Sequence, residues 1–186
     1  TQESLAAARK RLAFDELFLL QLGLRRQRAE WQSAAGQALA ASDEALATAL
    51  SGLPYALTEA QTRALADIRA DLARPTPMNR LLQGDVGSGK TVVAALAMLV
   101  AAEGGAQSAL MAPTTILAEQ HYRTVTGLLK RDDVALLLGS TPDAEKATIY
   151  AGLRDGSIKM VIGTQAIIQD RVEFAKLGLV VVDEQH

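Results

Sequence analysis

The stretch that decides the fold is Gly84-Asp85-Val86-Gly87-Ser88-Gly89-Lys90-Thr91. Its spacing, G-x-x-x-x-G-K-T, lets the glycines form a tight loop whose backbone N–H groups surround phosphate oxygens. Apolar runs precede and follow the loop, which predicts a strand before it and a helix after it. Such a helix directs the positive end of its dipole at the anion. The stretch therefore predicts a nucleoside triphosphate site, and a chance glycine-rich turn is a remote alternative.

The last two residues of this loop carry its side-chain chemistry. Lys90 is predicted to reach the β- and γ-phosphates, and the Thr91 hydroxyl to ligate Mg²⁺. The backbone from Gly84 to Gly89 would hold the remaining phosphate oxygens.

A pair of carboxylates, Asp183 and Glu184, follows the short apolar run Leu179–Val182. A buried strand that ends in an acid delivers it beside the phosphate loop of a doubly wound sheet. There Asp183 would hold Mg²⁺ through water, and Glu184 would orient or deprotonate the water that attacks the γ-phosphate. Alone, this pair would be interpreted as two ordinary solvent-exposed acidic residues at the end of a strand. Together with the phosphate loop, the catalytic interpretation is favoured.

Alternating apolar strands and helices predict the architecture after Pro54. A capped helix is expected from Thr58 to about Arg74. The expected strands are Arg80–Gln83, Ala109–Ala112, Val134–Leu138, Met160–Ile162 and Leu179–Val182, and the helices between them are Thr91–Glu103, Thr115–Arg131 and Pro142–Arg154. Continuous apolar strands that alternate with helices predict an α/β fold, with a parallel sheet covered by helices on both faces.

The segment before Pro54 has a different sequence pattern. Glu3 to Trp31 contains no proline and predicts one long amphipathic helix, with a second, short helix after Ser42. Its apolar stripe consists of Ala13, Leu17, Leu20, Leu24 and Trp31, widened by Phe14, Phe18 and Leu22. We therefore expect a helical linker over residues 1–53 and an α/β domain over residues 54–186.

Composition excludes several classes of protein. The 186 residues carry a net charge of −2, which argues against a protein that coats DNA with positive charge. No cysteine is present, so disulfides and thiolate metal sites are excluded. Val92–Ala102 is the longest purely apolar stretch, well short of the roughly 20 residues of a membrane-spanning helix. The chain lacks an initiator methionine, and we expect it to be a piece of a longer cytoplasmic protein.

Gln61 has two interpretations. Its amide could exchange hydrogen bonds with adenine N6 and N7. The pattern Thr58-x-x-Gln61 is also a capping box at a helix start, and spacing alone favours this interpretation. The two roles conflict only in part, because the Thr58 hydroxyl can cap the helix while the Gln61 side chain faces a base.

With these residues identified, the chain resembles the RecG family of ATP-dependent DNA helicases, within the superfamily-two helicases. The resemblance spans nearly the whole chain. It is carried by residues 11–17, Leu57-Thr58 with Gln61, the phosphate loop, Ala112-Pro113-Thr114, Leu117-Ala118-Glu119-Gln120-His121, Gly163-Thr164 and Asp183-Glu184-Gln185-His186.

The resemblance implies a RecA-like lobe that binds ATP and Mg²⁺, reads adenine with Gln61 and links nucleotide to DNA through His186. It also implies contacts to the backbone of one DNA strand, at Pro113, Thr114, Gly139, Ser140, Gly163 and Thr164. Without it these six residues would be read as turns and helix caps.

For the whole protein, the resemblance implies movement on forks and junctions in the cytoplasm, associated with the nucleoid. It further implies a second RecA-like lobe and a wedge domain outside this chain. Two alternatives stay open: a double-strand translocase of the Mfd type, and a nucleotide-binding or docking module without turnover.

Overall fold

The structure, a computed structural model, describes residues 2–33 and 35–184. The helices are α1 (Gln2–Ser33), α2 (Asp43–Ser51), α3 (Glu59–Leu72), α4 (Lys90–Glu103), α5 (Thr115–Leu129) and α6 (Asp143–Asp155), and η1 (Gln165–Ile168) is a short 3₁₀ helix. The strands are β1 (Gln107–Met111), β2 (Val134–Leu137), β3 (Met160–Gly163) and β4 (Leu177–Val182). No helix in these described ranges combines the length and apolarity that a membrane span requires.

The four strands form one parallel sheet in the order β2-β3-β1-β4. Alternate residues of each strand face opposite layers. Leu110 and Ile162 pack in a cluster with α4 and α5, whereas Ala109 and Val161 pack in a second cluster with α6 and η1. Both faces are therefore covered, and the predicted α/β architecture is confirmed.

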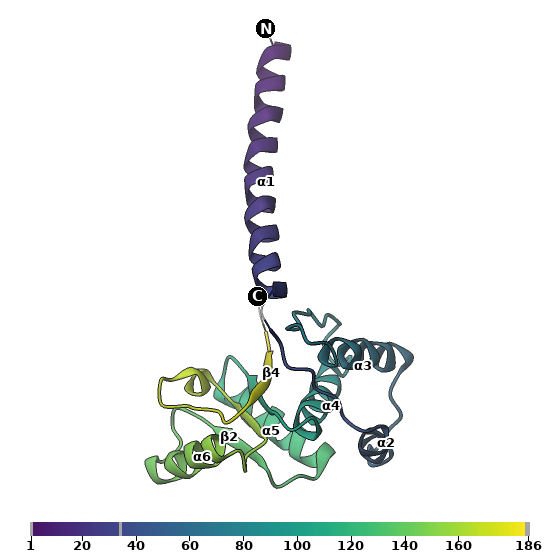
Figure 1. The fold of residues 1–186 in the computed structure, drawn as a ribbon, viewed down its shortest axis with the longest axis vertical. Coiled ribbons are helices and arrows are strands. Elements are labelled where there is room, and N and C mark those ends of the chain that lie inside the picture. Colours follow the sequence, from purple (N-terminus) through teal and green to yellow (C-terminus); the bar gives the residue numbers. More distant parts are fainter. Residues whose placement is uncertain (1, 34, 185–186) are drawn as a thin grey trace.

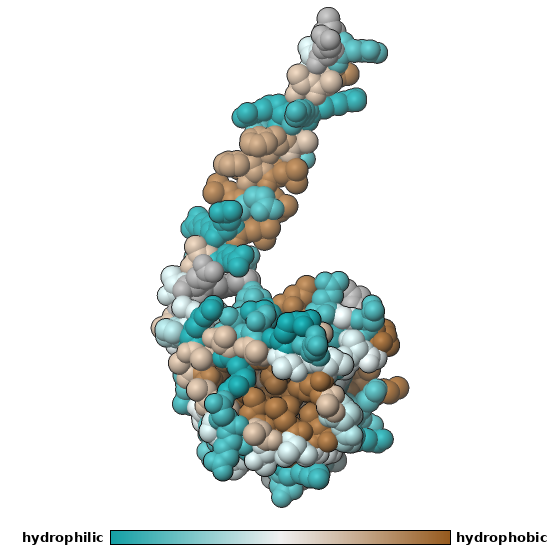
Figure 2. All heavy atoms as spheres, turned by 90° about the vertical axis from the view of Figure 1, so that its right-hand side faces the viewer, coloured by the Kyte–Doolittle hydropathy of each residue, from teal (hydrophilic) through white to brown (hydrophobic). Residues whose placement is uncertain are grey.

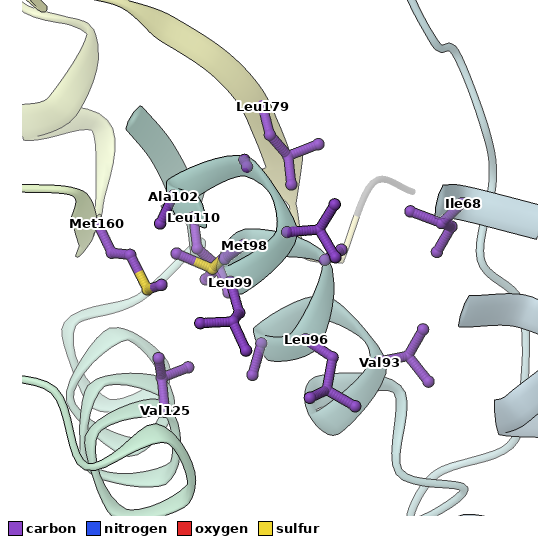
Figure 3. Packing of buried hydrophobic residues seen from close by; sticks show 14 of the residues in the cluster. Ile68, Val93, Leu96, Met98, Leu99, Ala102, Leu110, Val125, Met160 and Leu179 are labelled. Carbon is purple, nitrogen blue, oxygen red and sulfur yellow. The ribbon is translucent and has the colours of Figure 1, made fainter. Parts of the chain in front are cut away.

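The main core lies around α4, a helix that is apolar on all sides. Ten of its residues are buried, among them Leu96 and Met98, which are fully enclosed. Figure 3 shows these side chains between the strands, α5 and α3. Leu39 and Leu46 join the same cluster, so α2 and the chain before it also pack on this core. This packing holds the helix that carries the phosphate loop.

One expected strand, Arg80–Gln83, is wrong. These residues lie between α3 and α4 outside any helix or strand, and Leu81 is 76% exposed. A strand exists only where a neighbouring strand takes its backbone hydrogen bonds, and among the described residues none pairs with this run. In the described part of the chain, the outer edge of β4 also has no neighbouring strand, and Val180 is 55% exposed. Sequence propensity alone did not reveal that no described strand pairs with this run.

The long N-terminal helix is confirmed, and it projects away from the α/β body (Figure 1). Its described large apolar side chains are all more than half exposed: Leu5, Leu12, Phe14, Leu17, Phe18, Leu19, Leu20, Leu22 and Leu24. The Phe14 and Phe18 rings stack one turn apart, with centroids separated by 5.9 Å. The side chain of Trp31, which the sequence placed on the same stripe, lies outside the described part.

An apolar groove of about 530 Å³ lies between α2 and α3. Figure 2 views this side of the body and shows apolar atoms gathered in its centre. Leu46, Leu50 and Leu65 line it, and its one charged lining residue, Arg69, is paired with Asp43 at 2.6 Å. The groove therefore offers no cation for a phosphate, and the nucleotide site must lie elsewhere.

Candidate nucleotide and DNA site

The phosphate loop joins the unpaired run at 80–83 to the first turn of α4. Gly87 and Gly89 have φ angles of 81° and 79°, a left-handed conformation that favours glycine. Gly89 is the N-cap of α4 and makes no side-chain capping bond. The first N–H groups of the helix are therefore left for a ligand rather than for a capping side chain.

Lys90 is folded back over its own loop. Its Nζ donates hydrogen bonds to the carbonyl oxygens of Gly84 and Asp85, at 2.8 and 3.0 Å. Asp85, Val86 and Ser88 are exposed around it, and Thr91 follows on the first turn of α4. The loop thus gathers an ammonium group, backbone N–H groups and a hydroxyl, a donor set that fits a nucleoside triphosphate.

Gln61 touches the phosphate loop directly. Its Nε2 donates to the carbonyl of Ser88 at 2.9 Å, and its Oε1 accepts from the Thr58 N–H at 2.8 Å. The Thr58 hydroxyl accepts from the Gln61 N–H, so the predicted capping box is confirmed. An amide has two N–H donors and two acceptor sites, so one of each remains for adenine. The role of Gln61 in reading adenine stays a prediction.

Asp183 follows β4 and extends its pairing with β1. The Asp183 N–H donates to the carbonyl of Met111 at 2.9 Å. Its carboxylate Oδ2 lies 2.7 Å from Nε2 of His121 on α5, and the two side chains are 28% and 12% exposed. Glu184 comes next with a φ of 53°, a left-handed conformation that is uncommon outside glycine. Strained backbone of this kind concentrates at functional sites.

The loop and the carboxylates lie toward the same edge of the sheet. α4 ends just before β1 begins, so α4 runs antiparallel to the strands and starts where they finish. α4 also packs against β4, which Asp183 terminates (Figure 1). This arrangement brings Lys90 and Thr91 toward the strand end that carries Asp183.

The six candidate DNA contacts lie at or just after the ends of the other three strands, with Gly163 the last residue of β3. In register, Leu137, Gly163, Met111 and Val182 form one row across the sheet, at the ends of β2, β3, β1 and β4. Along the chain, Gly139 and Ser140 follow β2, Thr164 follows β3, and Pro113 and Thr114 follow β1. At roughly 4.8 Å between strands, the row is about 15 Å long.

The capping and turn interpretations of these residues hold in part. The Thr114 hydroxyl caps α5 by accepting from the Leu117 N–H, at 3.3 Å. The Gly139 carbonyl, within an exposed turn, accepts a hydrogen bond from Lys146 Nζ at 2.9 Å. Gly163 is buried, and a Cβ there would collide with the Leu137 carbonyl, so packing alone explains this glycine. Thr164, by contrast, makes no side-chain capping bond, so its hydroxyl is not committed to η1.

Gln185 and the coupling residue His186 lie outside the described residues. Within the part of the chain that the structure describes, no three His, Cys, Asp or Glu side chains gather as a metal site. Mg²⁺ commonly binds through one or two carboxylates together with substrate phosphates and water. Thr91 and Asp183 fit that arrangement only when a nucleotide completes it.

Comparison with known proteins identifies the family of the chain. A family profile described as "DEAD/DEAH box helicase" matches residues 58–186. The chain is 49% identical to the ATP-dependent DNA helicase RecG of Synechocystis, over 99% of this chain and 22% of that protein. It is 52% identical to RecG of Thermotoga maritima, over 98% of this chain and 24% of that protein. The chain spans about a quarter of the length of these curated relatives.

Solved structures agree with the sequence similarity. A structure of RecG bound to a three-way DNA junction superposes with a TM-score of 0.89 at 49% identity, covering all of this chain and 26% of that one. A hypothetical ATP-dependent RNA helicase from Sulfolobus tokodaii gives a TM-score of 0.56 at 22% identity, covering 76% of this chain and 41% of that one, and shows the fold alone. The predicted RecG resemblance is confirmed.

Proposed function

Because this chain belongs to the DEAD/DEAH box helicase family, we propose that it is the ATP-binding first lobe of a motor that moves along branched DNA. The observation that carries the proposal is the glycine-rich start of α4, which has no side-chain cap, on a helix that packs against β4, the strand that Asp183 follows. The choice of branched DNA rests on the 49% identity to a RecG protein solved on a three-way junction. In the longer protein this motor remodels stalled forks and recombination junctions.

In this proposal each part of the loop has a task. The Lys90 ammonium exchanges its two loop carbonyl partners for the β- and γ-phosphate oxygens of ATP. The backbone N–H groups from Gly84 to Gly89 hold the remaining oxygens. Thr91 and Asp183 would hold Mg²⁺, which would supply positive charge to the phosphates. The remaining N–H and the remaining acceptor site of the Gln61 amide hydrogen-bond to adenine. The amide keeps its present hydrogen bonds to the Ser88 carbonyl and the Thr58 N–H.

Glu184 is the residue we assign to the attacking water. It directly follows Asp183, so its carboxylate leaves the same strand end. A carboxylate there orients the water and accepts its proton as the water attacks the γ-phosphate.

The DNA backbone would follow the row of strand ends. We propose that Ser140, Thr164 and Thr114, in this order across the sheet, contact successive phosphates of one strand. Hydroxyls and backbone N–H groups at such positions hold the strand without reading its bases. Pro113, Gly139 and Gly163 shape the same edge, and His186 would link it to the nucleotide.

Other parts of the longer protein would complete the motor. Residues 1–53 would serve as a helical linker to a wedge domain that splits the branch point, and residues 54–186 as part of the first lobe. A second RecA-like lobe would close on the nucleotide and supply arginines to the γ-phosphate. The motor would work in the cytoplasm, on the nucleoid.

The test is DNA-stimulated ATPase of a full-length helicase that contains this chain, measured on forked and on linear duplexes of equal length. We expect forked DNA to stimulate turnover more strongly than linear DNA. Equal stimulation by both would favour a double-strand translocase and would overturn the proposed preference for branched DNA.

A second measurement concerns the chain by itself. An arginine supplied from a partner lobe is typically worth about 10³ to 10⁵ in turnover. We therefore expect the isolated chain to bind ATP but to show little stimulation of ATPase by DNA. Strong stimulation would mean that one lobe suffices.

A further inference from the structure

The chain has two histidines, His121 and His186, and the proposed mechanism does not use His121. It lies on α5, on the side that faces the end of β4. Its Nε2 is 2.7 Å from Oδ2 of Asp183, although the two residues are 62 positions apart. The imidazole is 12% exposed and the carboxylate 28%, so water competes weakly for this bond.

A short stretch of backbone after β1 joins these two side chains. The Asp183 N–H is fixed on the carbonyl of Met111, the last residue of β1. α5 starts four residues after Met111, with its first turn capped by Thr114. Both partners are thus anchored to the end of β1, which sets the ring and the carboxylate against each other.

The chemistry of the pair fixes the direction of the bond. An ionised carboxylate only accepts hydrogen bonds, so Nε2 of His121 carries the proton and donates. Oδ2 of Asp183 is thereby engaged, and Oδ1 is left for a ligand. Among the described residues, no other side chain hydrogen-bonds to Asp183.

We propose that His121 is a positioning residue that holds the Asp183 carboxylate in the orientation that binds the Mg²⁺ of the nucleotide. This inference rests on the proposed role of Asp183 as a metal ligand. Carboxylates that hold metals are themselves commonly fixed by hydrogen bonds, and loss of such a partner typically costs about 10- to 100-fold in metal affinity or activity. Without the imidazole, the Asp183 side chain would be free to rotate away.

The test is Mg²⁺-dependent binding of a fluorescent ATP analogue to the full chain, measured for three variants. His121→Ala removes the donor. His121→Gln keeps an N–H donor at a similar reach from the backbone. Thr126→Ala is the matched control, because it removes a part-buried hydrogen bond to the Tyr122 carbonyl on the same helix, away from Asp183.

For His121→Ala we expect the Mg²⁺ concentration at half-maximal binding to rise about 10- to 100-fold. Binding of the analogue in EDTA should stay unchanged, since the phosphate loop and Gln61 are untouched. His121→Gln should restore most of the metal dependence, and Thr126→Ala should match the wild type in both measurements.

Three results would overturn the inference. An unchanged Mg²⁺ requirement in His121→Ala would show that Asp183 needs no such partner. A parallel loss of binding in EDTA, in both His121 variants, would show that the ring only supports the fold. Binding by the wild type that is indifferent to Mg²⁺ would remove the metal role of Asp183, and the inference would fall with the proposed function.

Discussion

The two halves of the proposed nucleotide site are built in opposite ways. The phosphate loop is local: Lys90 bonds to the carbonyls of Gly84 and Asp85, within eight consecutive residues. The strand-end half is assembled from distant parts, since Asp183 takes its partners from Met111 on β1 and His121 on α5. One half depends on backbone conformation, and the other on the sheet and a packed helix.

This difference separates the effects of substitution. Changes in the loop should act on nucleotide affinity, because the loop supplies the groups that hold phosphates. Changes at the strand end should act on metal binding and turnover, because Asp183 and Glu184 contribute little to phosphate binding itself. The predictions below test this division.

The largest effect is expected for Lys90→Ala. Loss of the ammonium leaves the phosphate charge unmatched, so ATP-dependent unwinding by a full-length helicase that contains this chain should be abolished. A strand-displacement assay on a forked duplex measures it. Lys176→Ala is the control, because it removes an exposed lysine just before β4, at the far end of that strand. Normal unwinding by Lys90→Ala would refute the role assigned to Lys90.

Glu184→Gln should show the opposite pattern from a loop variant. We expect turnover in the same full-length protein to fall by about 10² to 10⁴, the range for loss of a general base, with ATP affinity largely retained. ATPase rates and equilibrium nucleotide binding measure the two quantities. Glu173→Gln, which alters an exposed pair with Arg154, should leave both unchanged. Normal turnover in Glu184→Gln would refute the role assigned to Glu184.

Gly89→Ala tests the backbone half. Alanine at position 89 must adopt a backbone φ near 79°. Its Cβ would also collide with Nε2 of Gln61. Left-handed backbone costs about 1 to 2 kcal/mol outside glycine, so ATP affinity should fall about tenfold. Gly105→Ala has a similar φ of 77° with open space around it, at the far end of α4. Gly105→Ala should therefore lower the stability of the fold without changing ATP affinity. Equal losses of ATP affinity in Gly89→Ala and Gly105→Ala would show that backbone strain acts through the whole fold.

The smallest effect is expected for Thr58→Ala, which removes the hydroxyl that caps α3. Loss of an N-cap costs about 1 kcal/mol of folding free energy, and denaturant unfolding measures it. The same variant tests whether the loop half is wholly local. Alanine keeps the Thr58 backbone N–H that bonds to Gln61 Oε1, but loss of the hydroxyl cap loosens the turn that holds this N–H in place. A fall in ATP affinity larger than that for Thr62→Ala would show that this segment orients Gln61.

Much of the fold could be predicted because its signals are short in range. The runs at 134–138 and 160–162 match β2 and β3 to within one residue, and Ser42 caps α2 as its side chain suggests. The helix expected to reach Arg131 ends at Leu129, because Lys130 adopts a left-handed φ of 50°. The strand expected at 80–83 fails for a different reason, because it needs a neighbour that no local pattern can reveal.

The sequence by itself determined the phosphate loop. The order of glycines, Lys90 and Thr91 fixes a backbone turn and a helix start through interactions between near neighbours. It also set the order of strands and helices along the chain.

Only the tertiary structure decided what surrounds Asp183. The pairing of β4 with β1 and the packing of α5 bring His121 to its carboxylate across 62 positions, and no spacing along the chain encodes such a contact. The physical reason is that strand order and helix packing follow from burial of the whole core, which depends on all of its residues together.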